Sequence, residues 1–96
     1  MKALYAEFTA RTGREERVAA LVAALATDVR NEAGCLLFDP YTRFEQPRAY
    51  VVFEVYRDAQ AFEDHLASLH SRRFNAALGE LIEGPGSTLA WLEPVA

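Results

Sequence analysis

Two titratable side chains, Glu54 and His65, are surrounded in the sequence by apolar residues and are the first candidates for chemistry. Glu54 lies within the apolar run 50–56, and His65 falls among the apolar positions of the helical stretch that follows. An imidazole titrates near neutral pH and can act as a base or as a hydrogen-bond donor. A buried glutamate can orient that imidazole, or act as the base itself if burial raises its pKa. We therefore predict that Glu54 and His65 line one pocket as catalytic residues.

Aromatic residues near this pair are candidates for binding a substrate. Tyr50 and Tyr56 lie on the same face of the predicted strand as Glu54, where they are placed to bind a phenolic oxygen or to stack on a ring. The predicted substrate-binding set is Tyr50, Tyr56, Phe38, Asp39 and Phe62. Such residues favour a small aromatic or hydrophobic ligand.

Each candidate also has a purely structural interpretation. His65 can be a packed helix residue bonded to a neighbour, and Glu54 can be the partner of an arginine such as Arg57 or of one across a dimer interface. Tyr50 and Tyr56 can be aromatic residues of the core or of an interface. An enzyme predicts that His65 and Glu54 converge on a cavity open to solvent. A binding protein predicts a closed apolar pocket without paired polar groups.

Several other residues are expected to be structural. Cys35 is predicted to be a small buried hydrophobic residue. His70, Arg72 and Arg73 are expected on a solvated surface, and Trp91 is expected to pack at a dimer interface.

Composition and length exclude several classes of protein. A chain of 96 residues is expected to form one domain, residues 1–96. Its formal net charge of −4, without a basic run, argues against nucleic acid as a partner. The single cysteine excludes a disulfide framework and a cysteine zinc cluster. No apolar run reaches the roughly 20 residues of a membrane span, and the N-terminal segment does not read as a signal peptide. We therefore expect a cytoplasmic protein that does not contact membranes.

Apolar periodicity predicts the elements that position the candidate residues. The predicted strands span residues 3–10, 35–38, 49–56 and 87–92, with 41–44 continuing the second strand beyond Asp39-Pro40 and 45–48 forming a turn. The first helix is expected to begin at a capping box, Thr12–Glu15, and to stop at Gly34. A second helix is capped by Asp58, with Phe62, Leu66 and Leu69 as its core stripe, and a further helical segment runs from 71 to 83.

This order, β-α-β-β-α-β, predicts an α+β ferredoxin-like fold, a four-stranded antiparallel sheet with helices on one face. The third strand is apolar on both faces, although a sheet with one solvated face should alternate. The 51 % hydrophobic content is also high for so small a chain. We therefore expect a homodimer that packs sheet against sheet, with the pocket inside each subunit between the sheet and its helices.

An ordered set of residues resembles the antibiotic biosynthesis monooxygenase domain family. The set consists of Gly34-Cys35-Leu36, Phe38, Pro47, Phe53-Glu54-Val55-Tyr56, Ala61 and His65. The resemblance extends from Gly13 to about Phe74 and implies a dimeric α+β barrel. Some members of the family oxidise quinols, polyketide phenols or anthrones with molecular oxygen and without a cofactor. Relatives include a quorum-signal phosphate isomerase and haem-degrading enzymes, so membership does not fix the reaction.

The chain departs from two branches of that family. The first strand lacks the asparagine of the haem-degrading relatives, and the only tryptophan, Trp91, lies on the last strand, so haem degradation is not expected. The asparagine-tryptophan-tyrosine-arginine set of the polyketide oxygenases has no residue-by-residue match here.

Three functions follow from these observations. The first is a monooxygenase that oxidises a small quinol, phenol or polyketide-like aromatic compound with O2. No metal-ligand cluster, glycine-rich phosphate loop or nucleophile elbow is recognisable in the sequence, so neither a metal nor a cofactor is expected. The alternatives are a non-catalytic dimeric ligand-binding or stress protein, and an isomerase of a small carbonyl compound that uses His65 and Glu54 for proton transfer.

Overall fold

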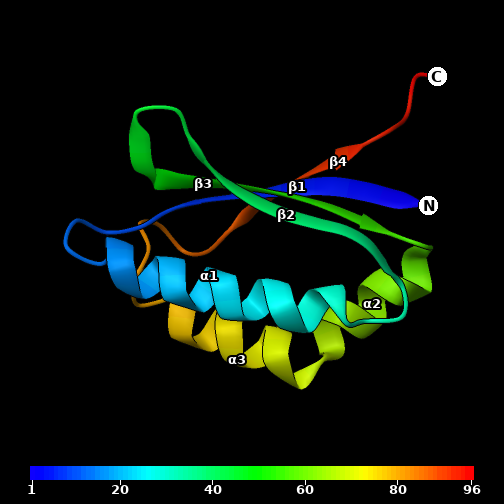
Figure 1. The fold of residues 1–96 in the computed structure, drawn as a ribbon, viewed down its shortest axis with the longest axis horizontal. Helices are drawn as coiled ribbons and strands as arrows, with labels where there is room; N and C mark the ends of the chain where they lie inside the picture. Colours follow the sequence, from blue (N-terminus) through cyan, green and yellow to red (C-terminus); the bar gives the residue numbers. More distant parts are fainter.

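The computed structural model describes residues 1–96, which form one sheet layer with three helices beneath it (Figure 1). The strands are β1 (Lys2–Thr9), β2 (Cys35–Arg43), β3 (Gln46–Tyr56) and β4 (Thr88–Leu92). The helices are α1 (Glu15–Arg30), α2 (Ala59–Ala67) and α3 (Leu69–Leu78). No helix is both long and apolar enough to cross a membrane.

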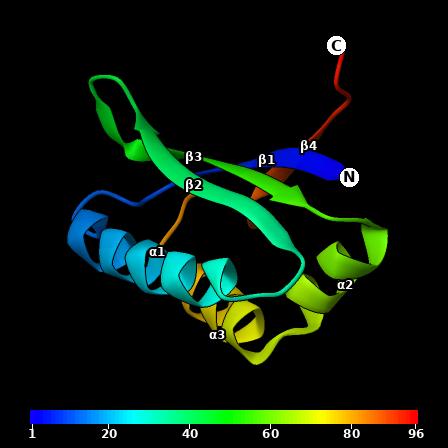
Figure 2. The ribbon, with the colours of Figure 1, turned by 45° about the vertical axis from the view of Figure 1, so that its right-hand side comes forward.

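The four strands are antiparallel and lie in the order β2-β3-β1-β4. This arrangement confirms the predicted ferredoxin-like fold, and α2 and α3 correspond to the two helical segments predicted after Asp58. Figure 2 shows that all three helices cover the same face of the sheet. In the register, Glu54 lies opposite Leu4 of β1 on one side and Phe38 of β2 on the other, so it occupies the centre of the helix-covered face.

The hairpin between β2 and β3 is tighter than the sequence indicates. β2 continues through Pro40. Proline has no backbone N–H group, but β2 is an edge strand, so no neighbouring strand on its outer side needs a hydrogen bond from this residue. The turn consists of Phe44 and Glu45, with Glu45 in the left-handed region at φ 61°. The predicted turn at 45–48 is therefore wrong, because β3 already begins at Gln46.

The helix ends correct two predictions and confirm a third. The capping box is wrong, because α1 has Arg14 at its N-cap without a side-chain cap, and the Glu15 carboxylate instead accepts from the Gly13 amide at 3.0 Å. α1 also ends at Arg30, before Gly34. Asp58 is confirmed as the N-cap of α2, where its carboxylate accepts from the Ala61 amide at 2.8 Å.

Gly34 has a packing role rather than a helix-stopping one. A Cβ atom built at Gly34 would lie 2.4 Å from the Cβ of Ala61, closer than real side chains approach. The lack of a side chain at Gly34 therefore allows the segment between α1 and β2 to lie directly against α2. Nearby, Cys35 is only partly buried and packs at the edge of the core.

The break between α2 and α3 redirects the apolar stripe. Ser68 has an extended backbone and caps α3, its hydroxyl accepting from the Ser71 amide. Leu66 and Leu69 are 46 % and 56 % exposed, so their prediction as core residues is wrong. The buried residues of α2 are Ala61, Phe62 and His65. α3 ends at Leu78, short of the predicted 83, and Ile82 then pairs with Ala10.

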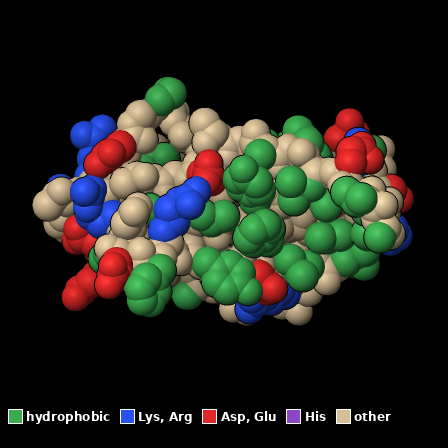
Figure 3. All heavy atoms as spheres, turned by 90° about the horizontal axis from the view of Figure 1, so that it is seen from above, with side chains coloured by type: hydrophobic (Ala, Val, Ile, Leu, Met, Phe, Trp, Pro, Cys, Tyr) green, Lys and Arg blue, Asp and Glu red, His purple; other side chains and the backbone are tan.

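The face of the sheet away from the helices carries a broad apolar surface (Figure 3). Tyr5 and Tyr41 pack against the two sides of Phe53, with ring centroids 5.7 and 6.3 Å away. The cross-strand register adds Leu37 and Val55 to this surface. We call these five residues the open-face patch.

Trp91 does not belong to the open-face patch. It lies opposite the buried Leu4 in the register of β4 and β1, which places it on the helix-covered side. Its ring packs edge-on against Phe62 with centroids 5.0 Å apart.

Candidate active site

A cavity of about 360 Å³ lies between the sheet and the helices. Its inner wall is apolar and includes Leu4, Phe38, Val52 and Phe62. Glu54 and His65 are the titratable groups of this wall, and both are buried. The exposed lining residues, which mark the mouth, are Leu66, Asn75, Gly79, Pro85, Ser87 and Leu89. The cavity therefore opens between the helices and the segment that leads into β4.

Glu54 projects from β3 into this cavity and is held by Tyr56 of the same strand. The Tyr56 hydroxyl donates to Glu54 Oε1 at 2.7 Å, and His65 Nε2 lies 3.8 Å from the same oxygen. Burial raises the pKa of Glu54 above its usual value, although the Tyr56 hydrogen bond and the nearby His65 partly oppose this effect. Burial and the neighbouring Glu54 charge raise the pKa of Tyr56 as well, so Tyr56 stays a hydrogen-bond donor.

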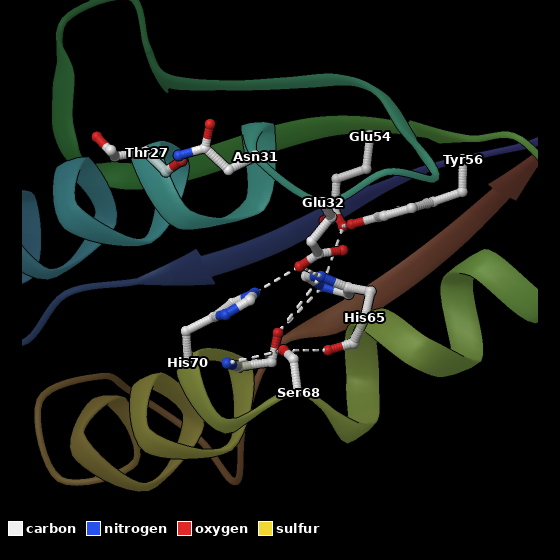
Figure 4. Close-up of polar contacts among 9 residues, drawn as sticks. Thr27, Asn31, Glu32, Glu54, Tyr56, His65, Ser68 and His70 are labelled. Carbon is white, nitrogen blue, oxygen red and sulfur yellow. Dashed lines mark hydrogen bonds and ion pairs between the residues drawn. The ribbon is translucent and has the colours of Figure 1, made fainter.

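His65 uses its other ring nitrogen to reach a residue that the sequence analysis missed. His65 Nδ1 lies 3.0 Å from Glu32 Oε2, in the segment between α1 and β2. The same oxygen lies 2.5 Å from Nε2 of His70, in the first turn of α3. Figure 4 shows Glu32 joined by dashed lines to both imidazole rings, with Glu54 and Tyr56 above the ring of His65. The buried Ser71 hydroxyl lies 3.3 Å from His65 Nδ1 and completes the surroundings of this ring.

The expectation of a solvated His70 is therefore wrong. Its side chain is only 27 % exposed, because the turn at Ser68 directs it back toward Glu32. The Ser68 cap was the available signal, since a new helix that begins at Leu69 places residue 70 in a first turn beside the end of α2. Nothing in the local sequence marked Glu32, which lies outside any helix or strand.

The cluster of Glu32, His65 and His70 contains atom types that also bind metal ions. Their ligating atoms all lie within 4.8 Å of one another. A tetrahedral ion at about 2.1 Å from each ligand would separate neighbouring ligand atoms by about 3.4 Å. The 2.5 Å separation of Glu32 Oε2 and His70 Nε2 is shorter than this spacing, and the 3.0 Å separation of Glu32 Oε2 and His65 Nδ1 is that of an ordinary hydrogen bond. The three side chains form a hydrogen-bonded network.

The structure brings four of the seven predicted site residues to the cavity wall. Glu54, His65, Phe38 and Phe62 line it directly. Tyr56 is completely buried behind Glu54 and contacts the site through its hydroxyl.

The other two predicted residues lie elsewhere. Tyr50 is buried and stacks on Phe8, with centroids 5.1 Å apart and planes 10° apart. Asp39 lies opposite Phe53 on the open side of the sheet and forms an ion pair with Arg30 at 3.3 Å. Among the alternatives, the ion pair between Glu54 and Arg57 does not form, because Arg57 pairs with Asp58.

Chemically, the arrangement provides a proton acceptor in an apolar cavity. His65 lines the cavity with Nε2 beside Glu54, and its Nδ1 lies 3.0 Å from Glu32 Oε2. A carboxyl group with a raised pKa, Glu54, lies beside the same ring nitrogen. These groups are suited to removing a proton from a bound acid and to returning it.

Comparison with known proteins agrees with this fold. The sequence model of the family described as antibiotic biosynthesis monooxygenase matches residues 1–77. A Mycobacterium tuberculosis protein named "Putative monooxygenase Rv0793" is 34 % identical over 83 residues, which cover 86 % of this chain and 81 % of that protein. The solved structure of Rv0793 has a TM-score of 0.91 and 32 % identity, covering 99 % of this chain and 95 % of that one. The structure of PA3566 from Pseudomonas aeruginosa has a TM-score of 0.91 and 28 % identity, with 99 % and 94 % covered. The predicted resemblance is confirmed, and the chain belongs to the antibiotic biosynthesis monooxygenase family.

Proposed function

We propose that this protein is a cofactor-independent monooxygenase that oxidises a small quinol, phenol or polyketide-like aromatic compound with O2. The observation that carries the proposal is the position of His65 and Glu54 together on the inner wall of an apolar cavity with an open mouth. A cavity of about 360 Å³ lies in the range that holds small organic ligands. The flat aromatic walls formed by Phe38 and Phe62 suit a planar ring.

The proposed reaction begins with removal of a proton. The hydroxyl group of the substrate gives its proton to His65 Nε2, and the resulting anion transfers one electron to O2. The two radicals combine to form a peroxide at a ring carbon, and the proton on His65 returns to the outer peroxide oxygen. The O–O bond then breaks, and the outer oxygen leaves as water together with the hydrogen of that ring carbon. A carbonyl group remains at the carbon. One oxygen atom of O2 stays in the product, and the other leaves in the water.

The protein contributes the base and the environment to this reaction. An apolar cavity strengthens electrostatic interactions and keeps water away from the reactive anion. Glu54 has a raised pKa and lies 3.8 Å from His65 Nε2, so in its protonated form it is placed to donate a hydrogen bond to the substrate oxygen. The Tyr56 hydroxyl fixes the Glu54 carboxyl in this position.

An isomerase of a small carbonyl compound is the second candidate, because it would use the same proton acceptor. Oxygen consumption separates the two functions. Purified protein is incubated with a panel of quinols and anthrones, and oxygen uptake is followed with an electrode. We expect uptake above the spontaneous rate, and we expect His65→Ala to abolish it while far-UV circular dichroism stays that of the folded protein. No uptake across the panel, or equal uptake by His65→Ala, would reject the oxygenase proposal.

We also propose that the open-face patch forms a homodimer interface. Apolar patches of this kind on small proteins commonly mark interaction sites. Phe53 lies at the centre of the patch and is 41 % exposed in the single chain. We expect Phe53→Glu to convert a dimer to a monomer in sedimentation velocity, whereas Phe44→Glu, at the exposed hairpin tip, should leave the dimer intact. A monomeric wild-type protein would contradict this proposal.

A further inference from the structure

The network around Glu32 connects the cavity with a second groove on the protein surface. Glu32 Oε2 is within hydrogen-bonding distance of both histidines, at 3.0 Å from His65 Nδ1 and 2.5 Å from His70 Nε2. His65 lines the cavity, whereas His70 lines a groove between α1 and α3. The only ion-pair partners of Glu32 are these two histidines. One carboxylate charge is therefore shared by two imidazole rings.

The two imidazole rings that share Glu32 differ in burial. The His65 side chain is 8 % exposed and the His70 side chain is 27 % exposed, so charging His65 costs more desolvation. Two imidazolium rings beside one carboxylate oxygen would repel each other. A charged His70 therefore disfavours a second charge on His65.

We propose that Glu32 holds one positive charge between the two histidines and that His70, by carrying this charge at rest, keeps His65 neutral and ready to accept a proton. His70 is then a positioning residue that acts on the substrate through His65. This inference rests on the proposed function for its catalytic role, although the charge distribution itself is a property of the resting protein.

The proposed exchange is balanced in protons. The substrate O–H bond breaks, and the proton binds to His65 Nε2, which makes His65 an imidazolium paired with Glu32. His70 then releases one proton to water and keeps the Nε2 proton that it donates to Glu32. When His65 later gives its proton to the peroxide, His70 takes one proton back from water. No electron is transferred in these steps.

Other titratable and charged groups surround the two rings. Glu54 and Tyr56 of β3 face His65 from the sheet, and Cys35 of β2 lies close enough for the Glu32 charge to raise its pKa further after burial. Asp28 of α1 and Arg73 of α3 line the groove beside His70. Replacing Arg73 thus changes a charge in the same groove without altering a contact of Glu32, and Arg73→Gln is the matched control.

The test compares His70→Gln with Arg73→Gln. In His70→Gln, Glu32 faces His65 alone and stabilises the protonated ring, so a smaller fraction of His65 is neutral and able to accept a proton at neutral pH. We expect the midpoint of the rising limb of kcat/KM for oxygen uptake to move upward by about one pH unit, with activity recovered at higher pH. Arg73→Gln should keep the wild-type profile. If His70→Gln lost activity equally at every pH, the substitution would only have damaged the protein, and that result would overturn the proposal.

A second measurement does not depend on the reaction. Nitrogen-15 NMR of the histidine rings in the resting protein reports which ring is protonated at each pH. We expect the His65 ring to stay protonated to a higher pH in His70→Gln than in Arg73→Gln. Identical His65 titration in the two variants would overturn the inference. If the wild-type protein consumes no oxygen with any substrate, the proposed oxygenase function fails, and the NMR comparison still decides the charge distribution.

Discussion

The contact between Gly34 and Ala61 allows a quantitative test of how the site is held together. A methyl group added at residue 34 would meet the Ala61 Cβ at 2.4 Å, and both atoms lie on backbone that is fixed, in the α1–β2 segment and in α2. Overpacking of this kind costs about 1–3 kcal/mol. We therefore expect Gly34→Ala to lower the free energy of unfolding by that amount, and the melting temperature by about 4–8 °C per kcal/mol. Urea denaturation followed by far-UV circular dichroism measures the change.

The double variant Gly34→Ala/Ala61→Gly identifies the cause. Once the Ala61 Cβ is removed, the nearest atom to the new methyl group is the Ala61 Cα at 3.4 Å, which is an ordinary contact. Ala61→Gly alone should cost about 1 kcal/mol in helix propensity and about 0.8 kcal/mol for the buried methyl group. The double variant should match Ala61→Gly within about 0.5 kcal/mol. If the two single costs simply add, the clash is not the reason for glycine at this position.

Three further predictions concern single contacts. Asp58→Ala removes the acceptor for the Ala61 amide and should cost about 0.5–2 kcal/mol of stability in urea denaturation, whereas Asp58→Asn should cost less; equal losses would argue against capping. Tyr56→Phe removes the donor to the buried Glu54 and should cost about 1–3 kcal/mol; an unchanged denaturation midpoint would contradict that role. Burial raises the pKa of Glu54 above 4.5, so the folded protein binds the proton of the Glu54 carboxyl more tightly than the unfolded chain does. Protonation of Glu54 therefore stabilises the fold fully below the unfolded-state pKa. This stabilisation is lost as pH rises through the folded-state pKa. Glu54→Gln should therefore gain stability relative to wild type as pH increases above about 4.5, and a constant difference between the two would refute this sign.

The fold was accessible from the sequence because its elements follow local rules. Alternation with a period of two placed Val52 and Glu54 on one face of β3, and the structure buries both. The position of Glu54 beside the helices followed from that pattern. The continuation of β2 beyond Pro40 was also predicted, and the edge position of β2 in the assembled sheet explains why the proline is tolerated there.

The positions of Glu32 and His70 in the site could not be predicted from the sequence. Glu32 lies in a connecting segment without periodicity, and its place beside His65 depends on the contact of Gly34 with α2. His70 looked like a surface residue because only the change of direction at Ser68 turns it inward. The same change of direction exposes Leu66 and Leu69. The turn at Ser68 therefore explains why His70 was wrongly predicted to be exposed and why both leucines were wrongly predicted to be buried.

The central claim is that the cavity of His65 and Glu54 supports insertion of an oxygen atom from O2. The most direct test is to supply ¹⁸O2 to the purified protein with a phenolic or quinol substrate and to weigh the product by mass spectrometry. We expect one labelled oxygen atom per product molecule, formed by the wild-type protein and not by a folded His65→Ala variant. A product without label, or a labelled product formed equally fast without the protein, would contradict the account.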